Sequence, residues 1–330
     1  MRNFTFKGLL LTAVFMLLGC LSIQAANDDL ITKQITINLD KAGTLPNKIA
    51  SSEMYKITNL EIIGEINGTD WNMIREMAGR DNRGYGTEGK LSVLDLSEAK
   101  IVAGGDYYYD DNLFNNKVYT SNDEIGEYAF YGCSGLTSLT LPAGITSIGE
   151  FAFSGCSGLT SLTLPAGITS IGEYAFYGCS GLTSLTLPAG ITSIGEFAFS
   201  GCSGLTSLTL PAGITSIGEF AFSYCSGLTS IYVYAEKVPR IGRYAFEGCA
   251  SRKCTLYVPK GTYDNYRLSE FGYFENIVEF DATGIDKTTT STDVEEVSRY
   301  SLNGQRLAVP VKGLNIVKYS DGTVRKVVVK

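Results

Sequence analysis

The 330-residue chain contains no histidine and a single tryptophan. Histidine is the side chain most often used for proton transfer near neutral pH, and it is the commonest nitrogen ligand of protein-bound metals. Its absence excludes Ser-His-Asp and Cys-His catalytic arrangements, which need an imidazole base. No motif for another catalytic chemistry is present in the sequence. We therefore expect a protein that is not an enzyme and has no cofactor.

The chain also lacks positive charge where its sequence is most regular. Residues 125–234 contain neither lysine nor arginine, and the chain as a whole has 27 basic and 34 acidic residues, for a net charge of −7. Binding of nucleic acid requires clustered lysine and arginine side chains. The composition therefore argues against a nucleic-acid partner.

Long apolar runs are absent except at the N-terminus. There, Arg2 and Lys7 precede the run GLLLTAVFMLLGCLSIQA, which ends in small residues. This pattern predicts a secretory signal peptide over residues 1–25, cleaved after Ala25, and a mature chain without a transmembrane span. The tetrapeptide LLGC, which ends at Cys20, resembles a lipobox. Lipidation of Cys20, with anchoring in a membrane, is therefore the alternative route of processing.

The most informative feature is an internal repeat with a period of about 23 residues. The segment IGEYAFYGCSGLTSLTLPAGITS occupies residues 125–147, and similar copies open at Ile148, Ile171, Ile194 and Ile217, with the loosest at Ile241. Residues 127–172 and 173–218 are identical, so the duplicated unit is a pair of copies. A closed barrel or a compact bundle has no reason to accept such a unit, whereas a solenoid grows by it.

Each copy has the pattern of one solenoid coil. The segment LTSLTLP, residues 136–142, alternates apolar and polar residues as a short strand does, and its proline ends the strand. Ile145 and Ile148 indicate a second extended piece, and EFAF at 150–153 indicates a short helical turn. One copy buries a single apolar stripe, which stacking at about 4.8 Å per coil would seal. We predict an elongated, β-rich, right-handed solenoid.

The repeat GLTSLTLPAGITSIGEFAFSGCS is similar over its full length to the repeat of BspA-like leucine-rich repeat proteins of bacterial surfaces. The L-x-x-L-x-L pattern is kept, but Gly144 occupies the usual asparagine position. The resemblance implies a leucine-rich repeat solenoid on a secreted or outer-membrane-associated protein. It also implies adhesion to an extracellular protein or polysaccharide, such as a host matrix protein, a glycan or another cell surface.

The rest of the chain divides around this array. Residues 26–102 read as divergent cap repeats with strands at NLEII and LSVLDLS and a helix over Asp70–Met77, followed by a surface loop over residues 103–124. The solenoid and its C-terminal cap span residues 125–280, and a threonine-rich linker spans residues 281–298. Residues 299–330 predict a small β module with hairpin turns at Asn303-Gly304 and Asp321-Gly322. This module resembles the sorting signal of type IX secretion.

Four groups of side chains are candidate sites. Tyr107–Tyr109 either contact a ligand or, as we prefer, pack against the cap. The glutamate column either binds Ca²⁺ or lies exposed in solvent, where unpaired backbone N–H groups of the helical turn favour it. Its members are Glu127, Glu150, Glu173, Glu196 and Glu219.

The cysteines and the threonines are the other two groups. The cysteine column, Cys133, Cys156, Cys179, Cys202 and Cys225, is expected to hold buried free thiols rather than a disulfide ladder, while Cys249 and Cys254 are a candidate disulfide. We predict no metal site, and a metal-binding surface protein remains an alternative. Threonines on the exposed side of the strands are either structural or the binding face. They are Thr137, Thr140, Thr160, Thr163, Thr183, Thr186, Thr206, Thr209 and Thr229.

Overall fold

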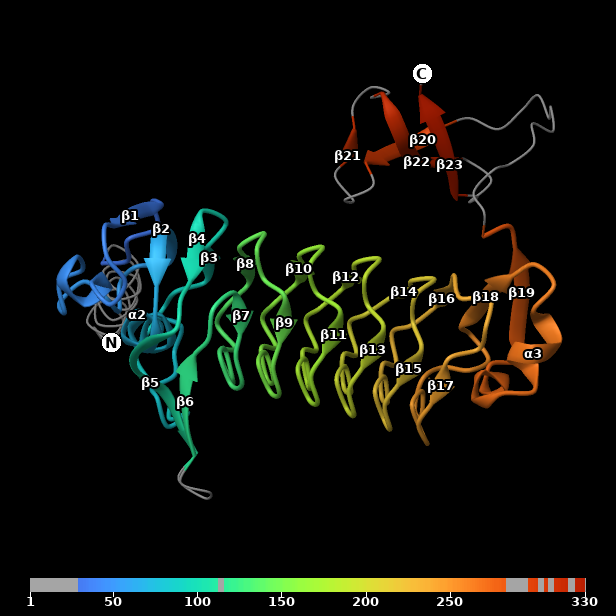
Figure 1. Ribbon diagram of the computed structural model, residues 1–330, viewed down its shortest axis with the longest axis horizontal. Helices are drawn as coiled ribbons and strands as arrows, with labels where there is room; N and C mark the ends of the chain where they lie inside the picture. The colour runs from blue at the N-terminus through green and yellow to red at the C-terminus, as the bar shows by residue number, and fades with distance from the viewer. Residues whose placement is uncertain are drawn as a thin grey trace, which may run out of the picture.

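The computed structural model describes residues 29–111, 116–282, 296–301, 306–307, 312–319 and 324–329. Between residues 29 and 282 the chain winds into coils that stack along one long axis (Figure 1). The structure is the predicted leucine-rich repeat solenoid. The signal peptide and Cys20 lie outside the described residues.

One side of the solenoid is a parallel sheet with one strand from each coil. Its strand order is β1-β2-β3-β8-β10-β12, with β4 also beside β2, and the line of strands continues as β14-β16-β18-β19. Pairing is in register, so that Leu162 faces Leu185. The strands are β1 (Ile35–Leu39), β2 (Asn59–Ile66), β3 (Val93–Asp95), β4 (Ala99–Ile101), β8 (Ser138–Thr140), β10 (Ser161–Thr163), β12 (Ser184–Thr186), β14 (Ser207–Leu210), β16 (Ser230–Val233), β18 (Thr255–Pro259) and β19 (Asn276–Phe280).

A second parallel sheet lines another side, with two residues from each coil. Its order is β17-β15-β13-β11-β9-β7, and the isoleucines of the ITSI segments point inward from it. The strands are β7 (Glu124–Ile125), β9 (Ser147–Ile148), β11 (Ser170–Ile171), β13 (Ser193–Ile194), β15 (Ser216–Ile217) and β17 (Arg240–Ile241).

The EYAF and EFAF segments form a third side without regular secondary structure. The expected helical turn is here a series of i→i−3 turns, such as Tyr131 N–H to Tyr128 O at 3.1 Å. Each series begins at an aromatic residue in the left-handed region, as at Tyr128 with φ 56°. The other N–H groups point along the solenoid axis: Tyr128 donates to Glu150 O at 3.0 Å and Phe130 to Ala152 O at 2.6 Å. The turns are therefore a third inter-coil ladder.

The core repeats the same side chains in every coil. Buried phenylalanine rings stack along the axis with centroids 4.9 to 5.5 Å apart, from Phe130 through Phe153, Phe176, Phe199 and Phe222 to Phe246. Beside them, the cysteine thiols from the second repeat onward donate to a phenylalanine carbonyl of the preceding coil, as Cys179 Sγ does to Phe153 O at 3.1 Å. Burial raises the pKa of the Cys179 thiol to about 12, so it stays neutral.

All the cysteines from Cys133 to Cys254 are buried free thiols, as predicted for the column. The disulfide considered between Cys249 and Cys254 is therefore not formed. Cys249 continues the column instead, because its Sγ donates to Phe222 O at 3.2 Å.

The N-terminal cap contains the predicted helix as α2 (Gly68–Met77) and a 3₁₀ turn, η1 (Leu45–Asn47). Asn67 and Asp70 form a capping box at the start of α2. The buried Asp70 carboxylate also accepts from the backbone N–H groups of Gly43 and Leu45, at 2.6 and 2.8 Å. These bonds compensate for its burial and fix the start of η1 against the helix.

The surface loop expected over residues 103–124 is instead an antiparallel pair, β5 (Gly104–Asp111) and β6 (Asn116–Thr120). Pairing is possible because β-forming tyrosines on β5 find a partner strand in the same segment. Tyr108 and Tyr109 are buried by this pair against the first coil.

The C-terminal cap follows β18 with α3 (Tyr263–Arg267) and η2 (Glu270–Tyr273) and then adds β19 to the first sheet. The β module is an antiparallel sheet of order β21-β20-β22-β23. Its strands are β20 (Glu296–Ser301), β21 (Arg306–Leu307), β22 (Gly313–Tyr319) and β23 (Val324–Val329). Residues 296–298, expected in the linker, thus belong to a strand, and both predicted hairpin turns lie outside the described residues.

Candidate binding face and the ends of the solenoid

The outer face of the first sheet carries two rows of small hydroxyl side chains. In each strand the middle leucine points inward, and the serine before it and the threonine after it point outward. The threonine row, Thr140, Thr163, Thr186 and Thr209, is exposed as predicted. The serine row, Ser138, Ser161, Ser184, Ser207 and Ser230, was missed by the sequence analysis, although the period-2 alternation of SLT places it on the same face.

The second predicted threonine row has a different role. Thr137, Thr160, Thr183, Thr206 and Thr229 precede the strands and are exposed, but their hydroxyls are already used. Thr183 Oγ1 donates to Thr160 O at 3.1 Å, and Thr229 Oγ1 to Thr206 O at 3.0 Å. Each hydroxyl thus fastens its coil to the preceding one. The structure separates the nine candidate threonines into a fastening row and a free row.

The free row changes character at its two ends. Strand pairing places Thr140 next to Asp95, and Asp95 next to Glu61, so the N-terminal end is acidic. At the other end Tyr232 takes the position after Thr209, and its ring stacks on that of Tyr257 with centroids 4.4 Å apart. The neutral hydroxyl rows therefore run from an acidic edge to a pair of tyrosines, which the sequence analysis did not foresee.

The glutamate column lies exposed along the turns, as expected. The expected reason is wrong, because the turn N–H groups are not unpaired: they donate to carbonyls of the next coil. The column ends when Arg243 replaces glutamate in the last coil, where Phe220 N–H donates to Arg243 O. Within the described residues, no three or more cysteine and carboxylate side chains are grouped to hold a metal ion.

The tyrosines of β5 pack against the first coil, which is the interpretation we preferred. Tyr108 is buried, and its hydroxyl donates to Glu127 O at 2.8 Å. Tyr109 stacks on Tyr128 with centroids 4.3 Å apart. Burial raises the pKa of Tyr108, so this hydroxyl remains a hydrogen-bond donor. Tyr107 is half-buried at the rim, with Lys117 Nζ 4.4 Å from its ring centroid.

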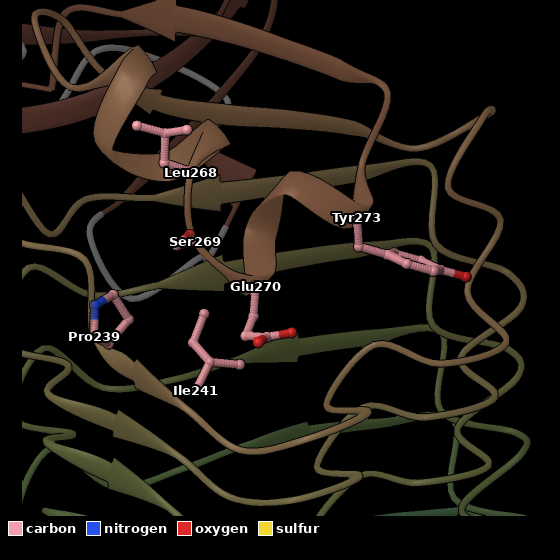
Figure 2. A pocket seen from close by; sticks show the side chains of 6 residues that line it. All are labelled: Pro239, Ile241, Leu268, Ser269, Glu270 and Tyr273. Atoms are coloured by element: carbon pink, nitrogen blue, oxygen red, sulfur yellow. The ribbon is translucent and has the colours of Figure 1, made fainter.

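A groove of about 530 Å³ lies at the opposite end, between the last coil and the C-terminal cap. Pro239 and Ile241 of the coil line one wall, and Leu268, Glu270 and Tyr273 line the other. Figure 2 shows the Glu270 side chain directed toward Ile241 and the Tyr273 ring directed away from both. No sequence motif indicated this groove, because it arises from two segments that meet only in the fold.

Comparisons with known proteins agree with this architecture. Residues 108–256 match the family model described as the BspA type leucine rich repeat region, in six copies. No curated protein matches the chain. Among the described residues, no helix has the length and apolar character needed to cross a membrane.

Three solved structures are similar to this chain. A leucine-rich repeat protein of T. pallidum is 33% identical, covers 42% of this chain and has a TM-score of 0.39. A leucine-rich repeat protein of Bacteroides ovatus is 22% identical, with 49% coverage and a TM-score of 0.26. A leucine rich cell surface protein of Faecalibacterium prausnitzii is 22% identical, with 62% coverage and a TM-score of 0.30.

The matched parts are 63%, 59% and 49% of the lengths of those three chains, so this chain spans less than two thirds of each. The repeat region of this protein, residues 108–256, therefore matches the BspA-type leucine-rich repeat region in sequence and has the leucine-rich repeat solenoid fold.

Proposed function

We propose that the protein is a secreted or cell-surface interaction module, without enzymatic activity, that binds an extended or repetitive ligand through the outer face of its first sheet. The observation that carries the proposal is the uniformity of the two outward rows, the free threonine row and the serine row. The same serine and threonine recur at the same position in consecutive coils, and no charged side chain points outward from strands β8, β10, β12, β14 and β16. Identical weak sites in a line favour a ligand that repeats along its own length, because avidity then accumulates.

Three lysine substitutions test this face. A triple variant that combines Thr163→Lys, Thr186→Lys and Thr209→Lys places three positive charges in the free row. The unaltered chain is first tested for retention on immobilised collagen, mucin and a neutral glucan. On whichever of these surfaces it binds, retention of the triple variant should fall at least about tenfold. The matched control places the same charges on the same coils at exposed turn positions, as Ala166→Lys, Ala189→Lys, Ala212→Lys. Equal binding by both triple variants would remove the face from consideration.

A passive stalk is the alternative, and the duplicated coils distinguish the two. Because residues 127–172 and 173–218 are identical, deleting residues 127–172 joins equivalent positions without a new junction. Two coils are lost, so the particle should shorten by about 10 Å in small-angle scattering. If the strand face is adhesive, the loss of two coils should lower its avidity. If the solenoid is a stalk, the particle should shorten and its binding should not change.

The proposal requires export. We propose cleavage after Ala25, with lipidation of Cys20 as the competing route, and sorting by the C-terminal β module in the manner of type IX secretion. Mass spectrometry of the mature N- and C-termini in cell fractions tests these events together. A mature N-terminus at Ala26 supports signal-peptidase cleavage, and a lipidated Cys20 supports the lipoprotein route. A retained C-terminal module would contradict its use as a cleaved signal.

A further inference from the structure

The two sheets end differently at the C-terminal side of the solenoid. The first sheet continues into β18 and β19, whereas the second ends at β17, which within the described residues pairs with β15 only. In the coil before, Thr215 O and Ile217 O accept from Arg240 N–H at 2.9 Å and Gly242 N–H at 2.8 Å. The equivalent carbonyls of the last coil, those of Pro239 and Ile241, have no donor in the described part of the chain.

The turn ladder is unfinished at the same place. Phe222 N–H donates to Ala245 O at 2.7 Å, and Tyr224 N–H to Glu247 O at 2.6 Å. One coil later, the corresponding N–H groups of Phe246 and Gly248 meet no acceptor among the described residues. Backbone groups of a folded protein are nearly always paired, and an unpaired strand edge is a template for another strand.

The groove places apolar side chains next to the open edge of β17. It lies directly beside β17, with Pro239 and Ile241 on the coil side. Opposite them stands Leu268, whose side chain is 86% exposed although it belongs to the cap. An apolar side chain inserted here would contact Ile241, and the exposed Leu268 lies at the rim of the same groove. The groove therefore suits an extended chain that pairs with β17 and buries every second side chain.

Charged side chains near the groove restrict which sequences the inserted chain can have. Arg243 occupies the end of the glutamate column and forms none of the ion pairs found in the described residues. A carboxylate one coil further along would stand beside it, as Glu219 does on the other side. Glu270 points toward Ile241, so a carboxylate at that position would be repelled (Figure 2).

We propose that the β17 edge binds an extended segment of a partner polypeptide by strand addition, with apolar residues in the groove and an acidic residue beside Arg243. This mode of recognition takes its affinity from main-chain hydrogen bonds and its specificity from pockets for alternate side chains. The segment ITSIGEF, residues 214–220, has this chemistry, because it makes the same pairing with the preceding coil inside the array.

The test uses a fluorescein-labelled peptide of sequence ITSIGEF and the full chain, with binding followed by fluorescence anisotropy. We expect saturable binding. N-methylation of the third or the fifth amide of the peptide removes a donor to Pro239 O or Ile241 O and should weaken binding about fivefold, the effect of about one hydrogen bond. Absence of binding at millimolar peptide, or affinities unchanged by both methylations, would overturn the proposal.

Protein variants test the side-chain part with matched controls. Leu268→Asp should reduce affinity at least about tenfold, whereas Tyr177→Asp, at an exposed tyrosine remote from the groove, should change nothing. The unaltered chain should bind ITSIGEF more tightly than ITSIGKF, and Arg243→Glu should reverse this preference. Misfolding cannot produce such a reversal. Equal affinities for the two peptides with both proteins would refute the charge contact. The β17 edge is separate from the strand face, so either proposal can fail alone.

Discussion

The two ends of the solenoid terminate the same ladders in different ways. At the N-terminal end, side chains replace the missing coil: the Tyr108 hydroxyl donates to Glu127 O, and Trp71 Nε1 and Arg75 both donate to Ala129 O at 3.0 Å. Inside the array, backbone N–H groups supply these bonds, as Phe130 does to Ala152 O. The N-terminal cap therefore imitates a coil with tyrosine, tryptophan and arginine side chains.

At the C-terminal end, the cap buries the apolar core but does not pair all the backbone groups of the last described coil. Phe271 and Phe274 pack on Phe246, each with centroids 5.3 Å apart, and close the phenylalanine column. Tyr273 OH donates to Cys249 O at 2.9 Å, but the N–H groups of Phe246 and Gly248 have no acceptor in the described chain. The comparison shows that covering the apolar core and providing hydrogen-bond partners for the backbone N–H and C=O groups are separate tasks. For the turn ladder the N-terminal cap performs both, because side chains pair the Glu127 and Ala129 carbonyls, and the C-terminal cap performs the first.

The largest expected effect, summed over its buried thiols, concerns the cysteine column that connects the two ends. Burial raises the pKa of Cys156 and of Cys179, whereas an unfolded thiol titrates near 8.5. Above that pH the unfolded state releases protons that the folded state keeps, so stability falls as pH rises. From pH 8 to pH 10 we expect a loss of about 2 kcal/mol for each of these thiols.

Urea unfolding at the two pH values measures this loss. In Cys179→Ala the difference between pH 8 and pH 10 should be smaller by about 2 kcal/mol, whatever the substitution costs at pH 8. A pH dependence unchanged by the substitution would mean that the thiol is not buried as described.

The next effect tests the N-terminal end directly. Arg75 is buried, and it donates to carbonyls of the first coil and, through Nη2, to Asp81 O at 3.1 Å. In Arg75→Met these carbonyls lose their donor, and the free energy of unfolding should fall by about 3 kcal/mol. The control is Arg243→Met at the exposed C-terminal end, with a change within about 0.5 kcal/mol. Similar losses for both variants would contradict the asymmetry of the ends.

The smallest effect concerns strain near the C-terminal end. Tyr224 has φ 57°, where the equivalent Gly201 has φ 75° and the other complete coils also have glycine. A non-glycine residue in the left-handed region costs about 1 kcal/mol, so Tyr224→Gly should stabilise the protein by about that amount. Thermal unfolding measures the gain, and Gly201→Tyr should show a loss of similar size. A destabilised Tyr224→Gly would show instead that the exposed ring contributes through its contact with Gly248.

Much of the fold could be predicted because the repeat is so regular. The constant spacing from Ile125 to Ile217 specifies the coil, the alternation in LTSLTLP specifies the strand, and the recurrence of cysteine with phenylalanine specifies the buried columns. The helix before residue 77 was predictable from its polar start and apolar spacing. These features are local, and each is repeated, so chance patterns are averaged out.

The sequence predictions were wrong where the structure of a segment depends on residues that are distant in the sequence but close in space. Residues 103–124 read as a loop because their tyrosines and aspartates have no clean alternation, yet β5 pairs with β6 once the pair is pressed on the first coil. Cys249 and Cys254 read as a pair because both leave the register that the cysteines keep from Cys133 to Cys225. The looser spacing of the last coil in fact keeps Cys249 in the column.

The candidate face shows the same division. The sequence indicated both threonine rows but could not distinguish Thr140, which is free, from Thr160, whose hydroxyl bonds to Thr137 O at 3.3 Å. That difference depends on the distance between coils. The serine row and the Tyr232–Tyr257 pair at its end could have been found from the alternation of SLT and its replacement by SIY in the fifth coil.

By itself the sequence determined the coil, its period and the stripe of leucine, isoleucine, phenylalanine and cysteine that each coil must bury, because these follow from patterns within a single repeat. Only the tertiary structure decided how the stack stops. The partners of Glu127 O and Ala129 O come from residues some 20 to 60 positions away. Within the described residues the edge at Ile241 is open because α3 and η2 cover the core without pairing the second sheet. Backbone pairing between coils is a long-range property, and no local pattern encodes where it ends.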